Sequence, residues 1–156
     1  MKPSYDPVAL SVPDEEVRVD QDQLYWRGSE RFTGFTGEML EGGVYEFQSF
    51  KDGLLDGPSG RISPDGDLIE EEWFQGNHLY GITREFRQDG TLATATGYQY
   101  GYPIWIVRFD FDGTSVLATE HPEPVYGQRE LIDILWSKRP MPALRGPEDA
   151  ADLSKH

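Results

Sequence analysis

Short apolar and aromatic runs alternate with glycine-containing turns along most of this chain. Three of the turns share an Asp-Gly pair, and they recur at a nearly constant interval: Asp65-Gly66, Asp89-Gly90 and Asp112-Gly113. An apolar residue stands four positions before each turn glycine: Ile62, Phe86 and Phe109. Because glycine accepts the positive φ angle of tight turns, the pattern predicts β-hairpins that repeat with a period of about 23–24 residues. Gly43 precedes Gly66 by the same interval and predicts an earlier copy, and the segment 24–37 predicts a degenerate opening copy.

A second series of glycines lies between the first. Each of its members follows an aromatic residue by three positions: Phe50 before Gly53, Trp73 before Gly76 and Tyr98 before Gly101. We expect these aromatic side chains to stack in a ladder along one face of the sheet, as part of the core. Gly57 and Gly81 also recur at this period, but Trp105 occupies the next equivalent position.

The segments between the turns are rich in residues that favour strands. Strands are predicted over residues 44–50, 60–63, 67–74, 82–87, 91–98, 104–111 and 114–118. The predicted fold is therefore all-β, an elongated antiparallel meander of repeated hairpins. Leu131, Ile134 and Leu135 fall at helical spacing within residues 127–138, before Pro140. This spacing predicts a short helix that packs on the last hairpin as a cap.

The chain of 156 residues is long enough for one ordinary domain with tails. The expected organisation is a flexible acidic segment over 1–20, a repeat domain over 21–120, a linker and capping helix over 121–139, and a flexible tail over 140–156. The N-terminus lacks an apolar signal core and no apolar run approaches the ~20 residues of a membrane span, so we expect a cytoplasmic protein.

Several kinds of chemistry lack the residues that they require. The chain has no cysteine, which excludes disulfides, thiolate nucleophiles and cysteine-bound metals. Its three histidines, His78, His121 and His156, lie far apart in the sequence, and no glycine series forms a phosphate-binding loop. We therefore expect no cofactor, no metal and no enzymatic activity.

The net charge of -14 narrows the choice of partners. Nucleic acids and anionic membranes need Lys and Arg to neutralise them, so we expect neither as a direct ligand. A partner with a basic surface is favoured instead. The alternative interpretation is that the acidity serves only solubility.

The most acidic stretch is Glu70-Glu71-Glu72. In a strand, Glu70 and Glu72 project from one face and Glu71 from the other. The pair of Glu70 and Glu72 has three interpretations. It forms a solvated face, it contacts a basic partner, or it takes part in acid/base or metal chemistry. Tyr and Trp side chains near turns suit the anchors of a protein interface. The candidate partner-binding residues are Glu46, Glu70, Glu72, Trp73, Tyr80, Tyr98, Tyr102 and Trp105.

Five segments of the chain resemble bacterial MORN-repeat-variant proteins of the YwqK-like type. They are Leu24-Tyr25-Trp26-Arg27-Gly28, Phe32-Thr33-Gly34, Phe50-Lys51-Asp52-Gly53-Leu54-Leu55-Asp56-Gly57, Pro64-Asp65-Gly66 and Phe86-Arg87-Gln88-Asp89-Gly90. The resemblance implies β-hairpin repeats and, as for many members of that family, an antitoxin or immunity role. It implies no catalytic residues. Trp105 and the scarcity of paired tyrosines before the turns depart from the family pattern.

Charge and resemblance together predict an immunity or antitoxin protein that neutralises a cognate toxin by direct binding. A nuclease, or another toxin enzyme with a basic surface, is the expected target because a cleft that binds nucleic acid must be positive. The free chain is expected to be a monomer or a homodimer. The alternatives are a non-enzymatic adaptor and a module that binds carbohydrate or lipid headgroups through its aromatic side chains.

Overall fold

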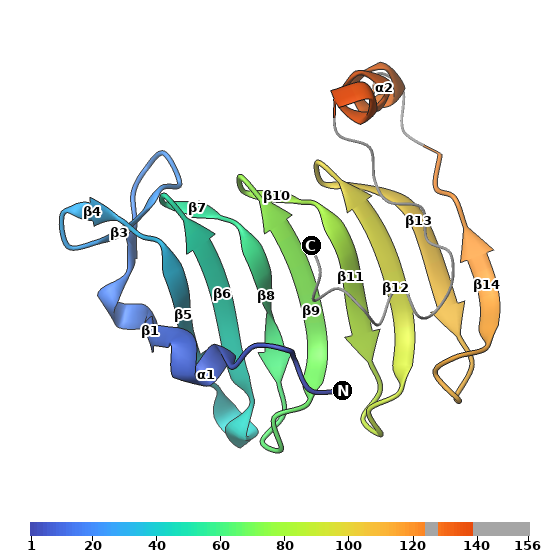
Figure 1. Ribbon diagram of the computed structural model, residues 1–156, viewed down its shortest axis with the longest axis horizontal. Coiled ribbons are helices and arrows are strands. Elements are labelled where there is room, and N and C mark those ends of the chain that lie inside the picture. Colours follow the sequence, from blue (N-terminus) through green and yellow to red (C-terminus); the bar gives the residue numbers. More distant parts are fainter. Residues whose placement is uncertain (124–127, 139–156) are drawn as a thin grey trace. The chain divides into compact units, whose positions relative to one another are not determined.

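The computed structural model describes residues 1–123 and 128–138, and within them the chain forms fourteen strands and two short α-helices (Figure 1). The predicted all-β meander of hairpins with a helix near the C-terminus is confirmed. The chain divides into two compact units, Met1–Asn77 and His78–His156. Each unit is described by itself below.

The first unit is built on a five-strand core in the order β1-β5-β6-β8-β9. These strands are β1 (Ser11–Pro13), β5 (Gly34–Met39), β6 (Tyr45–Lys51), β8 (Gly57–Ile62) and β9 (Leu68–Gln75). Strand β1 runs parallel to β5, whereas the remaining pairs are antiparallel. The shorter elements are α1 (Pro7–Leu10), the 3-10 turns η1 (Asp14–Glu16) and η2 (Glu41–Gly43), β7 (Leu54–Leu55), and a small sheet of β2 (Arg18–Val19), β3 (Tyr25–Arg27) and β4 (Glu30–Arg31).

The second unit contains an antiparallel meander in the order β11-β12-β13-β14. Its elements are β10 (His78–Leu79), β11 (Gly81–Phe86), β12 (Leu92–Gln99), β13 (Tyr102–Phe109), β14 (Val116–Glu120) and α2 (Gln128–Lys138). Helix α2 forms where the sequence predicts it. Leu131 and Ile134 are nevertheless 43% and 55% exposed, so these two side chains do not supply the packing expected of a cap. The predicted tail over 140–156, and residues 124–127 of the predicted linker, lie outside the described residues.

The glycine turns repeat in structure as they do in sequence. Gly43, Gly66, Gly90 and Gly113 have φ angles of 81°, 82°, 85° and 71°. Each of these glycines donates its backbone N–H to the carbonyl three residues earlier. A β-bulge accompanies the last three turns, with one unpaired residue on the strand that follows: Ile69, Ala93 and Leu117. The predicted repeat and the earlier copy at Gly43 are therefore confirmed.

In the second series of turns, the sequence analysis aligned one copy out of register by one residue. Two consecutive residues have positive φ in each of these turns: Asp52 and Gly53, Gly76 and Asn77, Tyr100 and Gly101. The second residue of each pair donates its N–H to a carbonyl of the preceding copy: Gly53 to Phe32, Asn77 to Leu55 and Gly101 to Leu79. Gly76 is thus equivalent to Asp52, and Asn77 is equivalent to Gly53.

This one-residue offset overturns the predicted aromatic ladder. Side chains alternate between the two faces of a strand, so a shift of one position moves a residue to the opposite face. The strand registers place Phe50 on one face of the first unit and Trp73 on the other. The residue at the phase of Phe50 is Phe74, and the equivalent position in the second unit is Tyr98. Phe50 itself packs against Tyr25 and Phe32.

The core residues before the Asp-Gly turns are buried as expected. Ile62, Phe86 and Phe109 all lie among the buried apolar side chains. In the first unit, Phe47 and Leu68 join Ile62 in the core; in the second, Ala95 and Val107 join Phe109. No helix within the described residues is long and apolar enough to cross a membrane.

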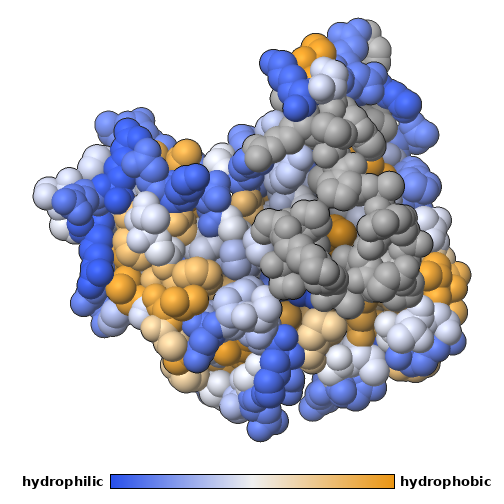
Figure 2. All heavy atoms as spheres, viewed as in Figure 1, coloured by the Kyte–Doolittle hydropathy of each residue, from blue (hydrophilic) through white to orange (hydrophobic). Residues whose placement is uncertain are grey.

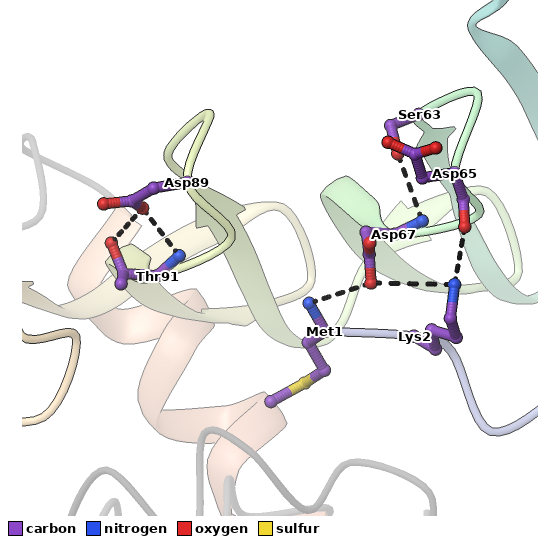
Figure 3. Close-up of polar contacts among 7 residues, drawn as sticks. All are labelled: Met1, Lys2, Ser63, Asp65, Asp67, Asp89 and Thr91. Atoms are coloured by element: carbon purple, nitrogen blue, oxygen red, sulfur yellow. Dashed lines mark hydrogen bonds and ion pairs between the residues drawn. The ribbon is translucent and has the colours of Figure 1, made fainter.

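Residues 1–20 differ from the flexible segment that the sequence predicts. Leu68 donates its N–H to the carbonyl of Met1. Lys2 Nζ lies 2.5 Å from the carbonyl oxygen of Asp65, a contact drawn in Figure 3. Asp6 caps α1 by accepting hydrogen bonds from the N–H groups of Val8 and Ala9. The Tyr5 ring packs against Phe35 and Phe47, and Pro7 is buried. Val8 and Leu10 of α1 are 48% and 53% exposed, and orange atoms lie at the surface in the region of α1 (Figure 2).

Candidate functional site

One face of the first unit carries a row of charged side chains that crosses four strands. Glu38 of β5 pairs with Glu46 of β6, Glu46 pairs with Arg61 of β8, and Arg61 pairs with Glu70 of β9. Paired residues of neighbouring strands project from the same face, about 5 Å apart. We call these four residues the acidic row. Three carboxylates and one guanidinium give the row a net charge of -2.

Charge is distributed unevenly within the acidic row. Arg61 Nε donates a hydrogen bond of 2.7 Å to Glu70 Oε1. This hydrogen bond, then the charge of Glu70 and that of Glu46, raise the pKa of Arg61 above its usual value. Glu38 and Glu46 are exposed, and neither forms an ion pair or a hydrogen bond with another of the described residues. The negative potential is therefore strongest at the Glu38–Glu46 end of the row.

Smaller polar side chains lie beside the acidic row on the same face. Thr36 pairs with Gln48, and Ser59 pairs with Glu72, each two residues along its strand from a member of the row. Thr36 and Ser59 are 6% and 5% exposed, and their hydroxyl groups have no hydrogen-bond partner among the described residues. Buried hydroxyls without a partner are costly, so these two positions oppose folding locally on this face.

The opposite face of the first unit holds the third glutamate of the acidic stretch. Glu71 is 1% exposed and accepts hydrogen bonds from the Tyr5 hydroxyl and, at 3.0 Å, from Trp73 Nε1. The expected division of Glu70 and Glu72 from Glu71 is therefore confirmed. Trp73 shares the face of Glu71, so it does not lie beside the acidic row. Its half-buried indole donates a hydrogen bond to a buried carboxylate.

The other candidate aromatic residues belong to the second unit. Trp105, predicted as an exposed anchor, is instead 6% exposed because it lies over Gly97, where there is no side chain to displace it. Tyr98 and Tyr102 are half-buried. Tyr80 is half-buried too, and its ring meets that of Tyr100 edge-on at a centroid distance of 5.6 Å. These residues do not form a single exposed cluster on their unit.

The aspartates of the Asp-Gly turns have structural roles. Asp89 accepts hydrogen bonds from the hydroxyl and the N–H of Thr91, which lower its pKa (Figure 3). Asp112 accepts from the hydroxyl and the N–H of Ser115 and from the N–H of Thr114, which lower its pKa to about 2. Within residues 1–123 and 128–138, no group of three potential metal ligands is placed to hold an ion. The turn interpretation of these aspartates is therefore favoured.

No family model matches the chain, and no curated protein matches it significantly.

Two members of the acidic row, Glu38 and Arg61, were missed by the sequence analysis. The repeat itself carries the signal that finds them. Positions 38, 61, 85 and 108 are equivalent, because each stands five positions before the turn glycine of its copy. The strand register places positions 46, 70, 94 and 118 opposite to them. Written in this alignment, the pairs read Glu38–Glu46, Arg61–Glu70, Glu85–Thr94 and Arg108–Ala118.

Proposed function

We propose that this chain is a protein-binding module that docks a basic surface of its partner on the acidic row. The finer proposal is that it is an immunity or antitoxin protein, which holds a toxic enzyme inactive by direct contact. The observation that supports the docking proposal is the alignment of Glu38, Glu46 and Glu70 on one face of a regular sheet. The antitoxin role rests on the resemblance of the repeats and on the net charge of -14.

Inhibition would follow from occupation of the partner's own charged site. A nuclease must present a positive cleft to its substrate, and an acidic surface competes for the same cleft. Electrostatic attraction between the two surfaces accelerates their encounter, and it weakens as salt screens the charges. Arg61 places one positive charge among the carboxylates of the acidic row. This pattern of charge favours a partner whose own charges are spaced to match it over an arbitrary polycation.

The proposal is tested by capture of the partner from the source cell with the immobilised chain. We expect one basic protein at near-equal amounts, released by a salt gradient and toxic when it is expressed alone. Charge reversal in Glu70→Lys and Glu72→Lys should weaken its capture at least about tenfold, since each change replaces an attraction with a repulsion. The matched control is Glu85→Lys, which makes the same change at an exposed position of the second unit.

Two outcomes contradict the proposal. Capture of several unrelated proteins that resist salt would favour an adaptor. Unchanged capture by both variants would remove the Glu70 end of the acidic row, and Glu72 beside it, as the docking face.

A further inference from the structure

The last strand of the second unit leaves one of its edges unpaired. Strand β14 pairs with β13, and no other strand of the described residues pairs with it. All five of its residues, Val116–Glu120, are exposed. A terminal strand presents unpaired N–H and C=O groups along its outer edge, where another extended chain can pair with them. Strand β14 contains neither proline nor lysine, the residues that commonly protect such an edge.

Apolar side chains are exposed on this strand and in the turn before it. Val116 and Leu117 are 50% and 65% exposed. Phe111, in the turn that joins β13 to β14, is 79% exposed. Exposed apolar side chains that gather at one place mark an interaction surface. The free edge and these three side chains therefore point independently to a protein partner at β14.

The exposed ring of Phe111 is held in place by Arg87. The guanidinium carbon of Arg87 lies 5.1 Å from the centroid of this ring. The same guanidinium donates hydrogen bonds to the carbonyl oxygens of Phe109, at 2.6 Å, and Asp110, at 3.0 Å. These two residues directly precede Phe111 in the chain. Because an aromatic side chain that is fixed before binding loses little conformational freedom in an interface, Phe111 is suited to act as an anchor.

The distribution of charge favours a second copy of the chain as the partner. A net charge of -14 opposes self-association, but residues 114–119 carry no charged side chain. If two β14 strands pair antiparallel about a two-fold axis at Thr119, Glu120 of each copy lies opposite Ala118 of the other. Ala118 pairs in turn with Arg108 of β13. Each Glu120 then lies between Arg108 of its own copy, with which it forms an ion pair, and Arg108 of the other.

We propose that two copies of this chain pair antiparallel through their β14 strands and form a dimer with two-fold symmetry. Each copy supplies hydrogen-bond partners to the free edge of the other, so both edges are satisfied at once. The same residues of both copies form the interface, which therefore closes and does not propagate into a fibre. The proposal is independent of the proposed function, because it concerns the second unit, whereas the acidic row belongs to the first.

The test is sedimentation equilibrium of the intact chain at concentrations up to about 1 mM. We expect a dimer that dissociates on dilution. Added salt should tighten it by screening the repulsion between two negative chains, whereas the same salt weakens the capture of a basic partner. Phe111→Ser should weaken dimerisation about tenfold, because it removes the anchor of each copy.

A charge swap at the two-fold axis tests the register. Thr119→Lys and Thr119→Glu each place two like charges directly opposite each other, so each variant alone should dimerise at least about tenfold more weakly. An equal mixture of the two variants should recover the dimer, because opposite charges then meet. This recovery separates loss of the interface from loss of the fold. The matched control is Met39→Lys, at a residue of β5 in the first unit that is 64% exposed, and it should leave dimerisation unchanged.

Four results would overturn the proposal. They are a chain that stays monomeric at about 1 mM, Thr119 variants that dimerise like the parent, a mixture of these variants that recovers no dimer, and equal weakening by Met39→Lys. A monomeric chain whose β14 amide signals shift in NMR only when a captured protein is added would assign the edge to that protein and reject the second copy.

Discussion

The Tyr5 hydroxyl provides a test of how the N-terminal segment is held. Tyr5→Phe removes one oxygen, while the ring keeps its contacts with Phe35 and Phe47 at centroid distances of 5.8 and 5.9 Å. The lost hydrogen bond ends on Glu71, a carboxylate that is only 1% exposed. Hydrogen bonds to charged groups contribute about 1.5–3 kcal/mol. Because Tyr5 itself is half-buried and water can replace part of the loss, we expect destabilisation of about 1.5 kcal/mol.

The assay is urea unfolding, combined with hydrogen exchange at single amides. Leu68 is the informative amide, since it donates to the carbonyl of Met1 and becomes accessible when the segment detaches. A loss of about 1.4 kcal/mol corresponds to exchange about tenfold faster. Tyr45→Phe is the matched control, because it makes the same change in the same unit at a hydroxyl for which no hydrogen bond to the described residues is found. Equal stability of the two variants, or unchanged exchange at Leu68, would refute the reasoning.

Two further predictions concern the second unit. Gly97→Ala should destabilise the chain by at least about 2 kcal/mol in urea unfolding, because the added Cβ would lie 2.3 Å from Trp105 Cε2. A variant as stable as the parent would contradict this, since it would show that the Trp105 ring moves aside without cost. The pKa of Asp112 is lowered from 3.8 to about 2, chiefly by the Ser115 hydroxyl, so its ionised form stabilises the fold above pH 4 and this contribution is lost as the pH falls towards 2. Thermal unfolding of Asp112→Asn should therefore differ most from the parent at neutral pH and least near pH 2, and a constant difference would contradict this.

Local sequence signals were sufficient to place the longer strands from β6 onwards and the turns between them, whereas β5 (Gly34–Met39) was not predicted as a strand. Every predicted strand overlaps an observed one, because Asp-Gly and Gly-Gly turns and β-prone runs are determined by residues close together in the chain. The face that each residue occupies was harder to predict. Trp73 was assigned to the wrong face because Gly76 was aligned with Gly53, and with a side-chain period of 2 an error of one residue reverses the assignment.

The remaining errors concern contacts between segments far apart in the sequence. Residues 1–13 are held in part by the contact of Tyr5 with Glu71, 66 residues away, and composition carries no trace of that contact. Trp105 is buried because Gly97 of the neighbouring strand leaves room for its ring. Glu38 was overlooked because its role depends on the partner opposite to it, Glu46, and only the strand register supplies that pairing.

The hydrogen bonds between the second turns give the array a direction. Gly53, Asn77 and Gly101 each donate to a carbonyl of the copy before it, at Phe32, Leu55 and Leu79. Every such acceptor is already synthesised when its donor leaves the ribosome. Each turn can therefore close without waiting for later sequence, and the copies can fold one after another during translation. A truncation from the C-terminal side would leave complete turns behind it, whereas a deletion of residues 24–37 would remove the acceptor on which the first turn closes.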